Sequence, residues 1–263
     1  AVVDAKNKLI TNFETGQVND THALAPIAID TKSLLGVENM DVLADKGYHT
    51  GDQLQQCDLA NIQTFVSPKE SASNNEEIFP VSRFIYNPDS DTYTCPAQQL
   101  LTTNNVWYKH SARGRTPAFR FKRYVTPHCK NCPLRKKCTK GEKNGRAIDR
   151  SEYAPVIDQN ARRVLQNPDY YRVRQQLAEH PWGTIKRQWG FDYTLVRGKE
   201  QVLGEVSLIF IGYNLARCIK ILGLERFIEI LGMAAKSGKT NQKQTNYSSI
   251  FPFRTEIQFY CAA

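Results

Sequence analysis

The chain has 263 residues, of which 41% are hydrophobic, so it is long and apolar enough to bury one large core. Its formal net charge of +9 is concentrated in residues 109–146, which carry 13 Lys or Arg and one acid and leave −3 for the remainder. A basic block in an otherwise near-neutral chain favours a polyanionic partner, most often nucleic acid, over a merely solvated loop.

Residues 1–67 alternate between short apolar runs and helical spacing, with polar turns between them. In chain order, the sequence predicts strands at 1–5 and 8–14, a helix capped at Asp20-Thr21, a strand at 40–44, a helix that begins near Thr50 and a strand at 61–66. Strands that alternate with helices are typical of an α/β layer.

The pattern changes at residue 68. Residues 68–150 alternate as strands and contain a cysteine-rich basic loop, so we interpret them as a β-rich insertion. Helical spacing returns over 151–231, as the remainder of the core. No apolar stretch reaches the ~20 residues of a membrane span, and we expect no membrane partner. Residues 232–263 are poor in apolar side chains and predict a disordered tail. The predicted fold class is α/β, a mixed sheet with flanking helices interrupted by the insertion.

One carboxylate stands where the strand at 40–44 meets a tight turn. Asp45 follows the apolar run Val42-Leu43-Ala44 and precedes Lys46-Gly47. The carboxyl ends of inner strands are where open α/β sheets place their functional sites. The alternative is that Asp45 caps a turn or a helix and has only a structural role.

A second acid, Glu179, lies in "LAEHPWGTIKRQWG" and follows the apolar face of a predicted helix. If the helix continues through Pro181, then Glu179, Trp182 and Lys186 project to one side, near the sheet. The alternative is an exposed Glu at a helix break. Two carboxylates at ~4 Å repel by roughly 4 kcal/mol at an effective dielectric of ~20, so such a pair needs a proton or a divalent cation. Oxygen ligands suit Mg²⁺ or Mn²⁺, and two such ions can promote phosphoryl transfer.

Four of the seven cysteines lie in the insertion, and an odd total favours a reduced, cytoplasmic compartment over a disulfide scaffold. They are Cys95, Cys129, Cys132 and Cys138. The Cys129-x2-Cys132 pair is typical of a tetrahedral Zn²⁺ knuckle, although the spacing to Cys138 is looser than in common zinc fingers. His110 and His128 are spare ligands. An iron–sulfur cluster or unligated thiols are the alternatives, and Cys57, Cys218 and Cys261 read as small core or tail residues.

Cations and aromatic side chains interleave in the basic block. The cations that we expect to contact DNA phosphates include Arg120, Lys122, Arg123, Arg135, Lys136 and Lys137. The aromatic residues are Trp107, Tyr108, Phe119, Phe121 and Tyr124. Stacking on bases is one reading of these aromatics. We favour the other reading, in which they form the small core of the insertion.

Four stretches carry a family resemblance. The segments "ADKGYHTGDQL", "TYTCPAQQLL", "CKNCPLRKKC" and "EHPWGTIKRQWGFDYTLVRGKEQVLGEVSLIFIGYNLARCIKIL" resemble DDE-type insertion-sequence transposases of bacteria, in the branch with a cysteine-bearing insertion. The likeness extends from Ala1 to about Leu222. It implies a ribonuclease-H-like fold with three metal-binding acids, which cleaves DNA at transposon ends and joins the resulting 3′-hydroxyl to target DNA.

The resemblance also assigns roles to single residues. Asp45 would be the second metal-binding acid and Glu179 the third, with Mg²⁺ or Mn²⁺ in a two-metal site. Lys186 would contact the DNA backbone, with Arg187 beside it. The family arginine expected four residues before the Glu is replaced here by Gln175, so Arg174 is only a candidate DNA contact.

The first acid of the family lies on a strand upstream of the segment that matches Ala1, so the sequence suggests an amino-terminally truncated transposase that is incomplete as given. Asp4 is a weak substitute, and Asp20 reads first as a helix cap. The resemblance further implies a homodimer on DNA in the bacterial cytoplasm, associated with the nucleoid. A non-enzymatic DNA-binding module that uses the basic zinc-knuckle insertion is the alternative function, and a nuclease without strand transfer is a third.

Overall fold

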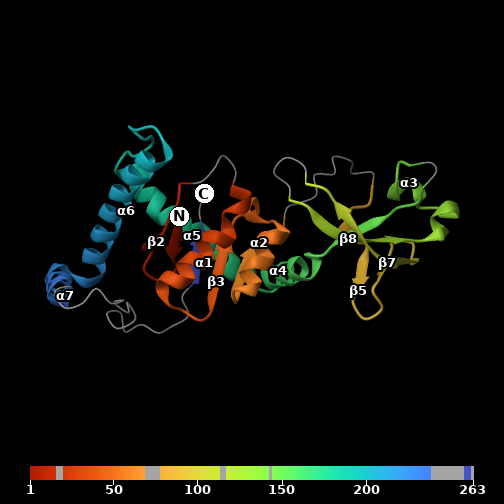
Figure 1. The fold of residues 1–263 in the computed structure, drawn as a ribbon, viewed down its shortest axis with the longest axis horizontal. Coiled ribbons are helices and arrows are strands. Elements are labelled where there is room, and N and C mark those ends of the chain that lie inside the picture. The colour runs from red at the N-terminus through yellow and green to blue at the C-terminus, as the bar shows by residue number, and fades with distance from the viewer. Residues whose placement is uncertain (16–19, 69–77, 113–116, 142–143, 238–257, 262–263) are drawn as a thin grey trace. The chain divides into compact units, whose positions relative to one another are not determined.

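The computed structural model describes residues 1–15, 20–68, 78–112, 117–141, 144–237 and 258–261. The chain divides into two compact units (Figure 1). The first unit contains Ala1–Lys69 and Val156–Ala263, and the second contains Glu70–Pro155. Each unit has its own five-stranded sheet and its own hydrophobic core. We describe each unit by itself.

The first unit is built on a mixed sheet with the strand order β2-β1-β10-β3-β4. Its strands are β1 (Val2–Asp4), β2 (Ile10–Asn12), β3 (Met40–Ala44), β4 (Ile62–Val66) and β10 (Gln258–Cys261). β1 is antiparallel to both β2 and β10, whereas β3 is parallel to both β10 and β4. β1 therefore runs opposite to the other four strands, and β10 occupies the centre of the sheet.

The tail of the chain differs from the expectation of disorder over 232–263. Residues 232–237 continue helix α7 (Leu224–Ser237), and 258–261 form β10. The expectation is wrong for these residues. The short run Gln-Phe-Tyr-Cys has strand-forming side chains, and it pairs with β1 on one side and with β3 on the other. Residues 238–257 and 262–263 lie outside the described residues.

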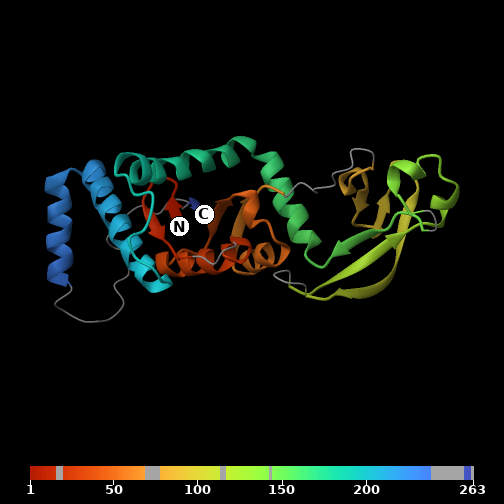
Figure 2. The ribbon, with the colours of Figure 1, turned by 90° about the horizontal axis from the view of Figure 1, so that it is seen from above.

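Helices cover both faces of this sheet, as Figure 2 shows. The helices are α1 (Leu24–Leu35), α2 (Gly51–Leu59), α4 (Ala154–Gln166), α5 (Pro168–Trp182), the π-helix Gly183–Gln188, α6 (Lys199–Leu222) and α7. Val42 and Ala44 of β3 face the core shared with α1 and α2, and Leu43 between them packs with Leu177 of α5 on the other face. Strict alternation along β3 thus builds a three-layer α/β/α unit.

Two asparagines close the two edges of the sheet. On the β4 edge, Asn160 of α4 accepts the Val66 N–H (3.0 Å) and donates to the Val66 carbonyl (2.7 Å). On the β2 edge, Asn214 of α6 accepts the Ile10 N–H (2.9 Å) and donates to the Ile10 carbonyl (2.7 Å). Each side-chain amide makes the paired backbone bonds that a further strand would make, which protects edges that would otherwise be open to pairing.

Helix α6 is the one helix of the described part that is long and apolar enough to cross a membrane by length and composition, which is weak evidence by itself. Phe210 and Tyr213 are buried against the sheet, and the Tyr213 hydroxyl donates to the Lys8 carbonyl (2.7 Å). The opposite face of the helix is exposed, as at Leu208 and Ile211. These contacts place α6 as a covering helix of the first unit.

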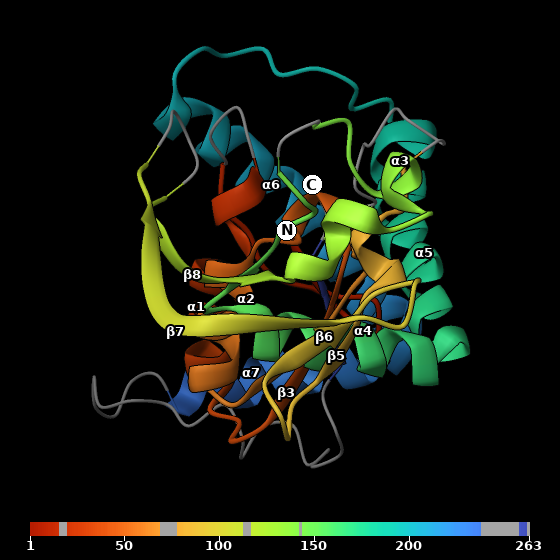
Figure 3. The same cartoon turned by 90° about the vertical axis from the view of Figure 1, so that its right-hand side faces the viewer.

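The second unit is an antiparallel sheet with the strand order β5-β6-β7-β8-β9, and Figure 3 shows β7 along its length. Its strands are β5 (Ile85–Asn87), β6 (Thr92–Thr94), β7 (Leu100–His110), β8 (Phe119–Val125) and β9 (Ile148–Ser151), and a short helix α3 (Arg135–Cys138) follows β8. β7 and β8 pair over most of their length and form a long ribbon.

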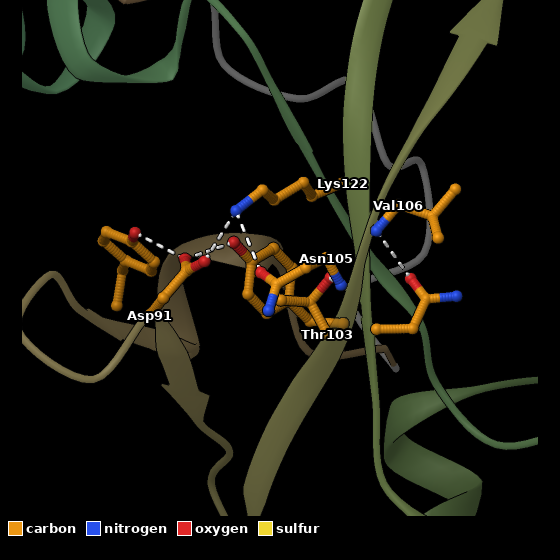
Figure 4. A network of polar contacts seen from close by, with 8 residues as sticks. Asp91, Thr103, Asn105, Val106 and Lys122 are labelled. Carbon is orange, nitrogen blue, oxygen red and sulfur yellow. Dashed lines mark hydrogen bonds and ion pairs between the residues drawn. The ribbon is translucent and has the colours of Figure 1, made fainter.

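A partly buried polar network ties the turn after β5 to the ribbon (Figure 4). One oxygen of Asp91 accepts hydrogen bonds from the hydroxyls of Tyr86 (2.8 Å) and Tyr124 (2.5 Å), and the other accepts from the Lys122 ammonium (2.9 Å). The Lys122 and Tyr124 hydrogen bonds lower the pKa of Asp91 to about 2. Burial, followed by the Asp91 charge, raises the pKa of Tyr124. The carboxylate therefore stays ionised and anchors three side chains.

We expect Asn160→Ala to lower the free energy of unfolding of the first unit by about 2–3 kcal/mol, because it leaves a buried N–H and a buried carbonyl of β4 without partners. The neighbouring Gln159 is exposed. Gln159→Ala is therefore the matched control and should change stability by less than ~0.5 kcal/mol. The measurement is urea unfolding followed by Trp182 and Trp189 fluorescence in a Trp107→Phe background. Equal effects of the two substitutions would contradict the edge-closing role of Asn160.

The stability of the second unit should fall in acid through Asp91. Its pKa is about 2 in the fold against 3.8 as the ordinary value, so ionisation stabilises the fold above about pH 4 and this contribution is lost as the pH falls towards 2. With a third of the side chain exposed (33%), we expect about 1 kcal/mol after solvent screening.

Urea midpoints of wild type and Asp91→Asn should therefore differ at pH 7 and converge as the pH falls from about 4 towards 2. Asp89→Asn, at an exposed position of the same turn, serves as control. A difference between wild type and Asp91→Asn that is independent of pH would contradict this assignment.

Candidate functional site

Asp45 stands at the carboxyl end of β3, where the strand gives way to the 3₁₀ turn Lys46–Tyr48. Its carboxylate accepts the Lys46 N–H (2.7 Å) and so begins this turn. The side chain is nevertheless 57% exposed. The structure therefore shows both features weighed from the sequence: Asp45 caps a turn, and it also presents a carboxylate at the end of an inner strand.

Helix α5 crosses the carboxyl ends of β3 and β4 and is fixed there by tyrosines. The Tyr171 hydroxyl donates to the Ala44 carbonyl (3.2 Å) and accepts the Ser67 N–H (3.3 Å). Tyr170 donates to Asp41 (3.0 Å) on β3. Tyr171 was not singled out from the sequence. Its only signal is its place three residues before Arg174, on the same helix face.

Arg174 binds the candidate acid directly. Its Nη1 lies 2.8 Å from Asp45 Oδ1, and its side chain is only 16% exposed. Partial burial opposes ionisation of Asp45, but the Lys46 N–H and the Arg174 guanidinium outweigh it and lower the pKa of Asp45. The Arg174 Nε is buried without a hydrogen-bond partner. The guanidinium thus points at Asp45 rather than at solvent, where a DNA phosphate would be met.

Glu179 lies five residues beyond Arg174 on α5 and is exposed. Leu177 is fully buried against Leu43 and Phe65. At about 100° per residue, Glu179 points away from the sheet rather than towards it as we expected. Within the described residues, no hydrogen bond or ion pair joins Glu179 to Asp45.

The helix does continue through Pro181, as the sequence suggested, and the π-helix Gly183–Gln188 follows it directly. Trp182 packs into the core, and the Lys186 ammonium lies 5.6 Å above its ring. Lys186 and Arg187 are both exposed. This segment therefore offers two cations to solvent at the end of α5. π-helical turns of this kind are frequent at functional sites.

The alternative acids have other roles or lie partly outside the described side chains. Asp4 accepts the N–H groups of Lys6 (3.3 Å) and Asn7 (2.6 Å) and so forms the turn after β1. Asp20 begins a 3₁₀ turn, Asp20–His22, and its side chain is not among those described. Asp4 makes no contact with Asp45 among those described.

The four cysteines of the second unit converge on one small cavity of about 20 Å³, which His128 also lines. Burial raises the pKa of the Cys138 thiol, and the nearby Cys132, Cys95 and Cys129 act in the same direction. A methyl group on Gly145 would lie 2.5 Å from Cys129 Cβ, so only glycine fits beside this cysteine. His110, the other spare ligand, instead stacks on Phe119 with 4.9 Å between ring centroids.

Among the residues that the structure describes, no group of three or more His, Cys, Asp or Glu side chains is arranged to hold a metal ion. This finding applies to the cysteines and to the acids of the first unit. The cysteines supply the right donors around a cavity of suitable size for one ion, and Asp45 supplies an accessible carboxylate. The structure thus gathers donors without completing a coordination site.

The cations on β8 are paired rather than free. Each forms an ion pair across the sheet or to the turn after β5, and the three pairs are Arg120–Glu152 (2.9 Å), Lys122–Asp91 (2.9 Å) and Arg123–Asp149 (2.7 Å). On α3, Arg135 donates to main-chain carbonyls of Lys130 and Gly141. Lys136 and Lys137 are exposed. The two lysines are therefore better placed to meet a phosphate than the cations of β8.

The aromatic residues of the second unit divide into two groups. Tyr124 is buried in the core with Tyr86 and Tyr93, as we expected for all of them. Trp107 and Tyr108, in contrast, are 45% and 37% exposed on the ribbon. That expectation is wrong for these two, because β7 and β8 extend past the core and have solvent on both faces. Trp107 lies under two cations, with Arg120 at 5.5 Å and Lys122 at 5.6 Å from its ring.

Residues 94–219 match the family model described as a transposase DDE domain. The match supports a DDE-type transposase. The matched segment includes Arg174, Glu179 and Lys186 as well as the four cysteines of the second unit, whereas Asp45 precedes it. No curated protein and no solved structure matches the chain.

Proposed function

We propose that this protein is a bacterial DNA transposase that cleaves strands at transposon ends and joins them to target DNA. The observation that carries the proposal is the placement of α5. This helix belongs to the matched transposase segment, carries Glu179, and is fastened across the end of β3 beside Asp45. An acid at a strand end and an acid on the helix above it are the two positions that the sequence resemblance assigned to catalysis.

The architecture of the first unit supports a ribonuclease-H-like fold. An antiparallel pair, β1 and β2, is followed in the chain by two parallel strands, β3 and β4, with helices on both faces. The second unit enters between β4 and α4 and leaves this layer arrangement undisturbed. We therefore propose that it is an insertion into the catalytic core.

We propose Asp45 and Glu179 as ligands of Mg²⁺ or Mn²⁺. The bound ions would activate a water or hydroxyl and stabilise the leaving oxygen in phosphoryl transfer. Asp45 suits this role because one of its oxygens has no described protein partner. Glu179 presents an exposed carboxylate, without a hydrogen bond or ion pair among the described contacts, on the helix that is anchored beside Asp45. Because this carboxylate points away from the sheet, joint ligation would require it to turn towards Asp45 when the ions and DNA bind.

DNA is the proposed partner of both units. Lys186 and Arg187 in the first unit, and Lys136 and Lys137 in the second, are exposed cations that could neutralise phosphates. Arg120 and Arg123 would have to exchange a carboxylate for a phosphate, which their largely exposed guanidinium groups allow at low cost. Lys122 would also have to leave the Asp91 network to meet a phosphate, at a higher cost. We further propose at least a homodimer, because two transposon ends must be brought together, in the bacterial cytoplasm.

We propose a structural Zn²⁺ at Cys95, Cys129, Cys132 and Cys138, where four thiols surround one cavity. The purified chain should then contain one zinc per molecule by elemental analysis. The double substitution Cys129→Ser/Cys132→Ser should lose it, whereas Cys218→Ser in the first unit should retain it. An iron signal, or a metal-free wild type that folds equally well, would contradict this proposal.

The catalytic proposal is tested on supercoiled plasmid DNA with the product of the complete coding sequence. We expect nicking that depends on Mg²⁺ or Mn²⁺ and that falls by at least about 100-fold in Asp45→Asn and in Glu179→Gln, since each removes a charge that orients the ions. Matched controls are Asp58→Asn and Glu200→Gln, which alter exposed acids elsewhere in the first unit.

If either site variant keeps full activity, that acid is wrongly assigned. DNA binding that weakens steeply with salt, without any metal-stimulated nicking, would instead favour a non-enzymatic DNA-binding module.

A further inference from the structure

We propose that Arg174 is a positioning residue for Asp45 and not a DNA contact. It would fix the carboxylate by one oxygen and leave the other oxygen directed to solvent for a ligand. This inference rests on the proposed function, in which Asp45 binds a divalent cation. It replaces the role in DNA binding that the sequence suggested for Arg174.

The two oxygens of Asp45 are used unequally. Oδ1 accepts both the Lys46 N–H (2.7 Å) and the Arg174 guanidinium (2.8 Å). Oδ2 has no described hydrogen bond or ion pair, although the side chain is 57% exposed. Two donors on one oxygen fix the rotation of the carboxylate, and the second oxygen remains available to a hard cation or a water.

The helix that carries Arg174 is itself fixed at this point. Tyr171 holds α5 to the ends of β3 and β4 through Ala44 and Ser67. Arg174 is three residues further along the same face, and its guanidinium lies 5.0 Å from the Tyr171 ring. The arginine therefore reaches Asp45 from a rigid base, which is what positioning requires.

Stability alone does not explain an arginine here. The side chain is 16% exposed, and its Nε is buried without a hydrogen-bond partner. Burying a guanidinium with an unsatisfied donor costs free energy. Because the partner carboxylate is more than half exposed, the ion pair contributes little stability in compensation. The same burial argues against a phosphate contact, because Nη1 already meets Asp45 and Nε is enclosed.

The test compares Arg174→Gln and Arg174→Lys with wild type, and uses Arg172→Gln as matched control. Arg172 lies on the same helix, is 80% exposed and, among the described contacts, forms an ion pair with Asp169 three residues earlier. Three quantities are measured: hydrogen exchange of the Lys46 amide by NMR without metal, Mn²⁺ affinity by calorimetry, and affinity for duplex DNA at several salt concentrations by fluorescence anisotropy.

We expect Arg174→Gln to speed exchange of the Lys46 amide, because the carboxylate that accepts it becomes free to rotate. We also expect about a 10-fold loss of the Mn²⁺ affinity that depends on Asp45, with partial rescue by Arg174→Lys. DNA affinity and its salt dependence should remain those of wild type, as in Arg172→Gln.

The inference is overturned if Arg174→Gln leaves the Lys46 amide and Mn²⁺ binding unchanged. It is equally overturned if the variant lowers DNA affinity and reduces the salt slope by about one, as loss of a phosphate contact would. A wild type whose Mn²⁺ binding does not depend on Asp45 would count against the proposed metal site. In that case, hydrogen exchange of the Lys46 amide in Arg174→Gln would still show whether Arg174 positions the Asp45 carboxylate.

Discussion

The first unit depends on the way in which its sheet is closed at both edges. Asn160 and Asn214 each present a side-chain amide that satisfies one residue of an edge strand, Val66 or Ile10, at both its N–H and its carbonyl. Val66 lies just before the chain leaves for the second unit, and Asn160 lies just after it returns. The two Asn160–Val66 hydrogen bonds therefore hold together the segment that leads into the second unit and the segment that returns from it. The second unit can then vary without opening the sheet that holds Asp45.

Electrostatics within the second unit are more local than its charge suggests. The segment 109–146 is strongly basic by count. Three of its cations, however, are matched by Asp91, Asp149 and Glu152, all of which lie outside that segment in sequence and come close only through strand pairing. Within the described part of the segment, the field available to a polyanion comes from exposed lysines such as Lys136 and Lys137. Long-range attraction and local contacts would thus be supplied by different side chains.

Much of the first unit could be predicted because its strands are short apolar runs bounded by polar turn residues. The apolar run Val42-Leu43-Ala44 ends at Asp45, and the strand predicted at 40–44 has those bounds in the structure. Edge closure could not be predicted, since Asn160 and Asn214 look like ordinary polar residues in helical patterns. The direction of Glu179 depended on which face of α5 packs on the sheet, and Leu177 decides it. The partners of Arg174 and Tyr171 could not be predicted, because these contacts depend on how α5 crosses the strand ends. No local sequence pattern contains that crossing.

The central position of β10 has a consequence for how the unit forms. The strand that separates β1 from β3 is made of residues 258–261, more than 200 positions after β3 in the chain. Until it arrives, β1 and β3 each present an unpaired side, and the sheet consists of two separate halves. Contacts of such sequence separation form slowly, and open strand sides invite pairing between molecules. Assembly of the sheet, rather than of any helix, should therefore limit the rate at which newly made chains become native and escape aggregation.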